Sequence, residues 1–411
     1  MIEKDFIILG VFIFTYSVLA LQKIPFLHLD RPAASLSGAV LMVIFGAVTL
    51  DGAYDLIDWN TITLLLGMMI MVGALRDGNF FRWLSFRVLS HSGNSIRLVW
   101  FLVFLSGILS AFFVNDTICI LMTPIILAMS EDGDIPAIPL LIALATSSNI
   151  GSAMTLVGNP QNMLIGIFSG ISFLKFFLIL APVAVLGLIM NVFLIRLVYK
   201  KDLSSKTFVL HHLEEPVIDK FQIYSALLVF LLVLVLFIFG FNLALSAITG
   251  AVLVMLMARK SPQFFFQHVD WSLLLLFCGL FVVVGSFKST HWMEYLKIGL
   301  GGENIFSDLI HFSGITVMAS NIVSNVPFVL LMESIVKSLP NPELFWIALA
   351  MASTFAGNFT LLGSVANIIV AETSKHKVKL GFGEFLKVGI ATTLASTLIG
   401  VVWIWTISEF I

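Results

Sequence analysis

One segment has the length of a membrane span but an interior that a simple span lacks. Residues 135–168 are long enough to cross a bilayer, because a transmembrane helix needs about 20 residues. Its middle, from Asn149 to Asn162, reads Asn-Ile-Gly-Ser-Ala-Met-Thr-Leu-Val-Gly-Asn-Pro-Gln-Asn and lies between two apolar runs. The glycines and the proline disfavour a continuous helix. Backbone that leaves the helix inside hydrocarbon persists only where it lines a cavity, and many secondary transporters build their binding site there.

The composition places the whole chain in a membrane. Of 411 residues, 59% are hydrophobic and 11% are charged, against about 25% charged residues in a typical soluble domain. The net charge of −2 is nearly neutral, so we expect no nucleic-acid partner. The first apolar stretch is expected to be a retained span, because acidic residues interrupt the basic start that a signal peptide needs. The expected partners are the lipid bilayer and a small-molecule or inorganic-ion substrate, and the long apolar faces suit a homodimer or lipid equally.

Several apolar runs are too long for one crossing and carry polar breaks. The candidate spans are 6–22, 33–50, 59–75, 98–130, 135–168, 172–195, 221–239, 242–258, 271–287, 305–336, 344–370 and 384–408. We interpret 98–130 and 305–336 as re-entrant hairpins that enter and leave on one side, and 135–168 and 344–370 as broken transmembrane helices. Most lysines and arginines, 17 of 22, then lie on one side, in the segments 23–32, 76–97, 196–220, 259–270 and 371–387. The positive-inside rule makes that side cytoplasmic. We expect a multi-pass protein of the cytoplasmic (inner) membrane.

The chain also repeats itself. Residues that recur at one constant offset are Gly38 and Gly250, Asp58 and Asp270, Gly67 and Gly279, and Gly73 and Gly285. Further along, Asn115 aligns with Asn325, and Thr155, Gly158 and Asn162 align with Thr360, Gly363 and Asn367. In this topology the two copies have opposite orientations, which is typical of transporters. We therefore expect an all-α polytopic fold with an N-terminal span at 1–32, a first inverted repeat at 33–195, a cytoplasmic linker and connecting span at 196–241, and a second inverted repeat at 242–411.

The polar residues of the hairpin tips and of the helix breaks are the candidate binding residues. Their side-chain oxygens and unwound carbonyls can coordinate Na⁺, and their amide and hydroxyl donors can hold oxyanions. The candidates are Asn115, Asp116, Thr117, Asn149, Gly151, Ser152, Thr155, Gly158, Asn159, Asn162, Ser324, Asn325, Asn358, Thr360, Gly363, Ser364 and Asn367. A Na⁺ ion would use Asp116, Asn115, Asn149 and Asn325. Helix packing through small residues is the alternative, but it does not account for the repeated Gly-x-x-x-Asn pairs at 158/162 and 363/367.

Asp116 is the only acidic residue between Ile96 and Ser130. A carboxylate in mid-membrane costs at least ~2.5 kcal/mol on insertion scales, so we expect it to face a cavity as a proton or cation site. A helix N-cap is a compatible alternative. No lysine or arginine is expected inside the membrane near these motifs. An ionised Asp116 would repel a polyanion in a low dielectric, which favours a neutral solute, a singly charged anion or a cation-accompanied anion. Glu333 is either a second ionisable site or a partner for Lys337 four residues later.

The paired tips, Asn115-Asp116-Thr117 and Ser324-Asn325-Val326, and the paired breaks resemble the ion transporter superfamily over about residues 33–408. That group includes divalent anion:sodium symporters, citrate-transporter-like permeases, arsenite permeases and some Na⁺/H⁺ antiporters. In the symporters both tips read Ser-Asn-Thr and help to bind Na⁺ and a carboxylate. The Asn-Asp tip is closer to arsenite-permease-like members, a resemblance that implies proton-coupled efflux of a neutral or weakly charged metalloid.

These features predict an ion-coupled secondary transporter that moves a small anion or oxyanion, arsenite-like, by alternating access. The coupling ion is H⁺ or Na⁺, and no cofactor is expected. The alternatives are a Na⁺/H⁺ antiporter and a sodium-coupled di/tricarboxylate or sulfate symporter. The chain has no His-Glu-x-x-His, Gly-x-Ser-x-Gly or Walker sequence, so we do not expect an enzyme.

Overall fold

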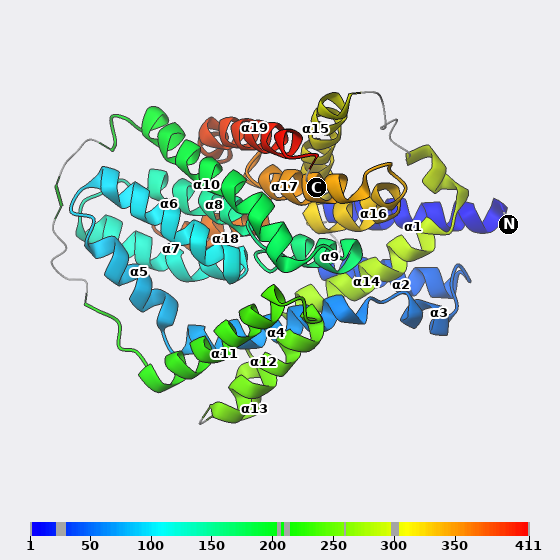
Figure 1. The fold of residues 1–411 in the computed structure, drawn as a ribbon, viewed down its shortest axis with the longest axis horizontal. Coiled ribbons are helices and arrows are strands. Elements are labelled where there is room, and N and C mark those ends of the chain that lie inside the picture. The colour runs from blue at the N-terminus through cyan, green and yellow to red at the C-terminus, as the bar shows by residue number, and fades with distance from the viewer. Residues whose placement is uncertain are drawn as a thin grey trace.

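The computed structural model describes residues 2–21, 30–203, 207–208, 214–258, 260–296 and 304–409. Within these residues the regular elements are all helices (Figure 1). Eight of the described helices are long and apolar enough to cross a membrane, which confirms the predicted all-helical, multi-pass class. These are α1 (Ile2–Leu21), α4 (Trp59–Asp77), α6 (Ser95–Phe112), α10 (Phe173–Val198), α11 (Lys220–Ile238), α14 (Trp271–Lys288), α15 (Ile305–Val323) and α19 (Phe382–Thr406). Parts of the predicted N-terminal segment (22–29) and linker (204–206 and 209–213) lie outside the described residues.

The remaining helices connect or interrupt these spans. They are α2 (Arg31–Ile44), α3 (Leu50–Asp55), α5 (Phe80–Ser90), α7 (Asn115–Asp132), α8 (Ala137–Ser152), α9 (Pro160–Ser169), α12 (Leu243–Met257), α13 (Pro262–Phe266), the 3-10 helix η1 (His291–Leu296), α16 (Asn325–Lys337), α17 (Pro342–Ala356) and α18 (Val365–Ser374). The single span predicted at 33–50 is wrong in its second half. Gly46 turns the chain after α2 with φ of 69°, a conformation that glycine adopts without strain, and Thr49 then caps α3.

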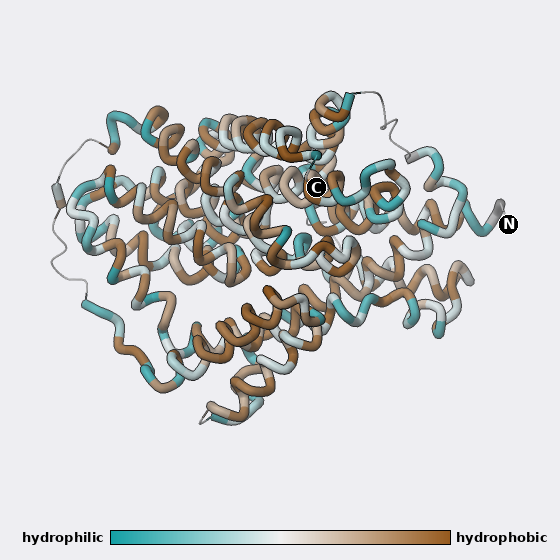
Figure 2. The backbone as a smooth tube through the Cα atoms, in the orientation of Figure 1, coloured by the Kyte–Doolittle hydropathy of each residue, from teal (hydrophilic) through white to brown (hydrophobic). Residues whose placement is uncertain are grey.

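The outer surface of the helices is apolar, as a lipid environment requires. Large hydrophobic side chains on α10, α11, α12 and α19 point outward, and Leu197, Leu228, Leu256 and Leu394 are each more than half exposed. Figure 2 shows hydrophobic colour along most of the helical tube, with hydrophilic segments gathered at the helix ends and connections. Apolar surface of this extent marks contact with a membrane or a partner, and the span lengths favour the membrane.

The two predicted repeats pack against each other through equivalent helices. A Cβ atom at Gly67 of α4 would lie 2.5 Å from the carbonyl carbon of Ala247 in α12. A Cβ atom at Gly279 of α14 would lie 2.5 Å from the carbonyl carbon of Ser35 in α2. The sequence separation between Gly67 and Gly279 equals the separation between Ser35 and Ala247, so the two contacts are equivalent in the two repeats. The recurring glycines therefore permit close backbone approach. In each contact a helix of one repeat packs on a helix of the other, α4 on α12 and α14 on α2.

The helices are interrupted at the polar segments. The first hairpin pair, α6 and α7, is separated by Phe113 and Val114, and the second pair, α15 and α16, by Ser324. Residues 153–159 separate α8 from α9, and residues 357–364 separate α17 from α18. Helix α7 packs on α18, and its counterpart α16 packs on α9. Each hairpin thus meets the broken helix of the other repeat, whereas the re-entrant path of the hairpins through a bilayer stays a prediction.

Candidate functional site

The two helix breaks are closed by the same hydrogen bonds. In the first break, the Asn162 Nδ2 donates to the carbonyl oxygens of Ser152 and Thr155, each at 3.1 Å. In the second, the Asn367 Nδ2 donates to those of Gly357 at 2.7 Å and Thr360 at 3.1 Å. Both asparagines are fully buried. They satisfy carbonyls that the broken helix leaves unpaired, which would otherwise be costly in a membrane interior.

The glycine of each Gly-x-x-x-Asn pair permits the tight loop. A Cβ atom at Gly158 would lie 2.3 Å from the Ser152 carbonyl oxygen, and one at Gly363 would lie 2.6 Å from the Asn321 Oδ1. Real Cβ atoms do not approach this closely. The first loop could not close in this form around a larger residue, because the contact is with backbone, whereas at Gly363 the Asn321 side chain would have to move. The glycine and asparagine of the repeated motif therefore build the break, and of these four residues only Gly363 also lines the central cavity described below.

Asn149 joins both breaks and the first hairpin. Its Oδ1 accepts hydrogen bonds from the Asn115 Nδ2 at 2.9 Å and the Ser364 Oγ at 3.0 Å. Its Nδ2 donates to the Asn358 Oδ1 at 2.9 Å and the Asn367 Oδ1 at 3.0 Å. One buried side chain thus links α7, α8, the second break and α18 across the two repeats, and this amide network fixes their relative positions.

The hairpin tips are held by backbone contacts. The Asn115 amide nitrogen donates to the Gly158 carbonyl at 3.1 Å, which attaches the first tip to the first break. At the second tip, the Tyr16 hydroxyl of α1 donates to the Pro327 carbonyl at 2.8 Å. Ser324 has φ of 76°, a region that residues other than glycine rarely adopt and that is often found at functional sites.

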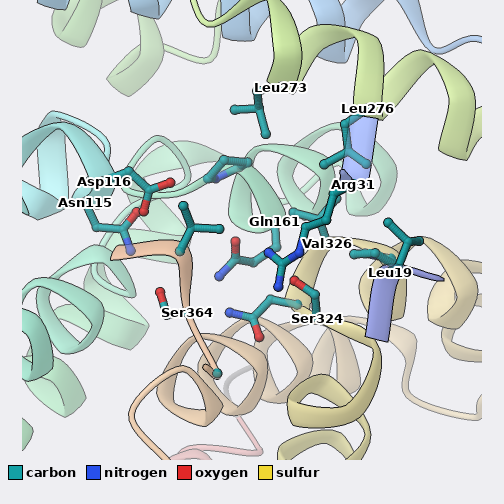
Figure 3. Close-up of a pocket in the computed structure, with 15 residues that line it drawn as sticks. Leu19, Arg31, Asn115, Asp116, Gln161, Leu273, Leu276, Ser324, Val326 and Ser364 are labelled. Atoms are coloured by element: carbon teal, nitrogen blue, oxygen red, sulfur yellow. The ribbon is translucent and has the colours of Figure 1, made fainter. Parts of the chain in front are cut away.

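A cavity of about 60 Å³ lies where the tips and breaks converge (Figure 3). It is lined by Leu19, Arg31, Asn115, Asp116, Pro160, Gln161, Leu273, Leu276, Ser324, Asn325, Val326, Pro327, Gly363, Ser364 and Val365. The Oδ1 atoms of Asn115 and Asn325 are buried and have no hydrogen-bond partner within the described part of the chain. Buried amide oxygens normally have partners, so these two acceptors are available to a bound solute or cation.

Arg31 is the main departure from the sequence analysis, which expected no cation near the motifs and placed this residue in a basic loop. It lines the cavity from the first turn of α2, and it interacts electrostatically with Asp116. In Figure 3, Arg31 and Asp116 approach from opposite sides with Gln161 between them. No carboxylate lies within 4.0 Å of its guanidinium among the described residues. The cavity therefore presents one positive group and one acidic group.

Asp116 also faces a second cavity, of about 250 Å³. Arg76, His268 and Asp270 line that cavity with Thr117, and the first three belong to segments predicted to be cytoplasmic or at their boundary. The two cavities share Asp116, Pro160, Leu273 and Val365. The Asp116 side chain therefore lies between the central cavity and a second space beside the predicted cytoplasmic loops, where a few charged or polar residues lie among mostly apolar ones.

The structure sorts the predicted site residues into two layers. Asn115, Asp116, Ser324, Asn325, Gly363 and Ser364 line the central cavity, and Thr117 lines the second one. Asn149, Gly151, Ser152, Thr155, Gly158, Asn159, Asn162, Asn358, Thr360 and Asn367 line neither of these two cavities and stand behind the loops that do. Of the expected Na⁺ ligands, Asn149 therefore already uses its amide within the protein, whereas the other three face the cavity.

Sequence reasoning missed Arg31 and Gln161. Gln161 lies inside the first break, next to candidates that were named, and its position in a polar interruption was the available signal. Glu333 is explained without a site, because it bonds Lys337 at 2.8 Å, as its spacing suggested, and also Lys288.

Comparison with known proteins identifies the family. The family model of citrate transporters, CitMHS, matches residues 12–346. The chain belongs to the citrate transporter family. This family lies within the superfamily that the paired motifs resemble, so that resemblance is confirmed. The family and the named relatives are transporters, and the chain is a membrane transporter rather than an enzyme.

Individual relatives and solved structures extend this result. A rice protein (Oryza sativa subsp. japonica) named silicon efflux transporter LSI3 is 30% identical, with 92% of this chain and 93% of that protein covered. A Dictyostelium discoideum protein named as a transporter, arsB, is 28% identical over 96% of this chain and 90% of its own length. The YdaH transporter of Alcanivorax borkumensis is 14% identical with a TM-score of 0.60, covering 99% of this chain and 98% of that one. The last match shows a similarity of fold alone.

Proposed function

We propose that this member of the citrate transporter family is an ion-coupled secondary transporter of a small anion or oxyanion, arsenite-like. The solute site is the central cavity between the hairpin tips and the helix breaks. One observation carries the proposal: Arg31 and Asp116 face the same cavity as the amide oxygens of Asn115 and Asn325, which have no hydrogen-bond partner among the described residues. A positive group binds an oxyanion, free acceptors take hydrogen bonds from the hydroxyl groups of its weak acid, and an ionisable acid can carry the proton.

The size of the cavity supports a small solute. Its volume of about 60 Å³ exceeds the ~10–15 Å³ that one water molecule needs, so it holds a compact oxyanion more readily than a tricarboxylate. The names of two relatives point the same way, since one is called a silicon efflux transporter and another arsB. We place the protein in the cytoplasmic membrane with its basic loops in the cytoplasm, in keeping with a 30% identical membrane protein of Mycobacterium leprae.

A Na⁺/H⁺ antiporter is the second candidate. Three oxygen-bearing side chains, Asn115, Asp116 and Asn325, face one cavity, and the two amide oxygens among them have no protein partner in the described residues. Oxygen ligands of this kind suit a hard cation such as Na⁺. In this mechanism Asp116 binds H⁺ and Na⁺ in turn, and the positive charge of Arg31 limits how much cationic charge the cavity can hold.

The Asp116→Asn variant tests the proposal. Purified protein is reconstituted in liposomes with an internal pH dye, and arsenite, sulfate, citrate and NaCl are added separately. We expect arsenite to change the internal pH with the unsubstituted chain and to leave it unchanged with Asp116→Asn, because asparagine cannot take up a proton. Glu333→Gln is the matched control, since that carboxylate lies in the second hairpin outside the cavity and its variant is expected to keep the signal.

The other outcomes separate the candidates. A pH change with NaCl alone would favour the antiporter, and a citrate or sulfate signal that requires Na⁺ would favour the symporters. An arsenite signal that persists in Asp116→Asn would remove Asp116 from the coupling step. No signal from any of the four solutes would refute the proposed function itself.

A further inference from the structure

The position of Arg31 restricts the charge that a transported solute can carry. The residue begins α2, where the Asp30 Oδ1 accepts a hydrogen bond from the Ala33 amide at 3.0 Å and Pro32 occupies the first turn. This cap fixes the start of α2, and from there the side chain reaches the space between Gln161 and Ser324 (Figure 3). The guanidinium is partly buried and lacks a direct ion pair in the described chain. Such a group is a strong site for an oxyanion, because its planar fork matches two oxygen atoms.

The charges around Asp116 can be counted from each element that faces it. Arg31 of α2 interacts with it across the central cavity, and Cys119 lies one turn along α7. The second cavity adds Arg76, His268 and Asp270. Asp270, which carries a like charge, also interacts electrostatically with Asp116 from that space, but it does not line the central cavity. The net charge of the central cavity is therefore set by Arg31, by the protonation of Asp116 and by the solute.

Two states leave this low-dielectric space neutral. In one, Asp116 is ionised and balances Arg31, so only a neutral solute adds no charge. In the other, Asp116 is protonated and a singly charged anion balances Arg31. A divalent anion leaves at least one uncompensated negative charge in either state, which is unfavourable in a poorly solvated cavity.

We propose that Arg31 is the anion-binding residue of the cavity and that it restricts charged cargo to singly charged oxyanions, which bind together with a proton on Asp116. The inference rests on the proposed function and names its substrate class. The anion and the proton together have the composition of the neutral weak acid. Occupancy by either form then leaves the site electrically balanced. A singly charged anion moves in the same direction as its proton, whereas a neutral solute such as arsenite binds while Asp116 is ionised and is exchanged for the proton that Asp116 takes up after the solute has left.

Two small solutes of different charge provide the test. In mildly acidic buffer, selenite is mainly a singly charged anion and arsenite mainly a neutral acid. Binding of each is measured by microscale thermophoresis with the purified protein and with Arg31→Gln, Arg31→Lys and Asp116→Asn. We expect Arg31→Gln to weaken selenite binding roughly ten- to a hundredfold, which is the strength of hydrogen bonds to charged groups. Arsenite binding should change only a few-fold, and Arg31→Lys should recover part of the selenite affinity.

Asp116→Asn supplies the second half of the test, because asparagine imitates the protonated acid. It should bind selenite at least as tightly as the unsubstituted chain does. Equal selenite affinity in Arg31→Gln and the unsubstituted chain, or loss of selenite binding in Asp116→Asn, would overturn the inference. Equal loss of selenite and arsenite in Arg31→Gln would also overturn it, because a charge-selective residue acts on the anion alone. In each of these cases, the proposed function is retained if arsenite still changes the internal pH in the liposome assay with the unsubstituted chain. If arsenite causes no pH change with the unsubstituted chain, both the proposed function and this inference are refuted.

Discussion

Substituting Gly151 by alanine is expected to destabilise the protein by about 3 kcal/mol, at the upper end of the usual range for overpacking. A Cβ atom there would lie 2.0 Å from the carbonyl oxygen of Gly107 and 2.4 Å from its Cα. These are backbone atoms of α6, which cannot rotate away as a side chain can. Helices α6 and α8 would have to separate, and the first hairpin would move relative to the first break.

Gly314→Ala is the matched control. Gly314 also lies inside a helix, α15, but nothing lies within 4 Å of a Cβ atom built on it. Alanine favours the helix by roughly 1 kcal/mol over glycine, so this variant should be equal to the unsubstituted protein or slightly more stable. The free energy of unfolding is measured by SDS titration in mixed micelles with circular dichroism. Equal stability of the two alanine variants would show that the close approach of α6 and α8 is not a constraint.

The second large effect is expected at Asn149, where alanine should cost about 3 kcal/mol and abolish arsenite transport. The substitution leaves the donors of Asn115 and Ser364 and the acceptors of Asn358 and Asn367 without their buried partner. Each unsatisfied buried group costs about 1–3 kcal/mol, and the sum is smaller because neighbouring groups rearrange. Without this amide the first tip is no longer attached to the second break, so the cavity loses its shape.

Asn191→Ala separates the loss of stability from the loss of the site. Asn191 is equally buried and hydrogen-bonds to Thr146 and Thr392, but it lies in α10 and does not line the cavity. We expect a similar drop in the free energy of unfolding, measured as for Gly151, with arsenite transport per folded molecule changed only a few-fold. Transport retained in Asn149→Ala, or lost equally in both variants, would contradict the role of Asn149 in positioning the cavity.

Much of the fold could be predicted because the signals are local. The length of an apolar run predicts a span, and glycine, proline and asparagine inside a run predict a break. The breaks at 153–159 and 357–364 and the hairpin interruption at Ser324 lie where these residues cluster. The end of α2 was missed, because the apolar run continues beyond Ile44 and only the backbone conformation of Gly46 turns it.

The composition and repeated motifs were sufficient to predict a helical membrane transporter with paired hairpin tips and paired helix breaks, since hydrophobic length and helix-breaking residues act within a single segment. They could not divide the polar residues into those that line the cavity and those that close the loops behind it. That division depends on which amides find partners across the two repeats, as Asn149 does with Asn358. The composition and motifs also could not place Arg31 in the cavity, because in the sequence it is one basic residue beside a predicted span. Its position in the cavity follows from the packing of α2 against α14, which brings residues distant in the sequence to one cavity.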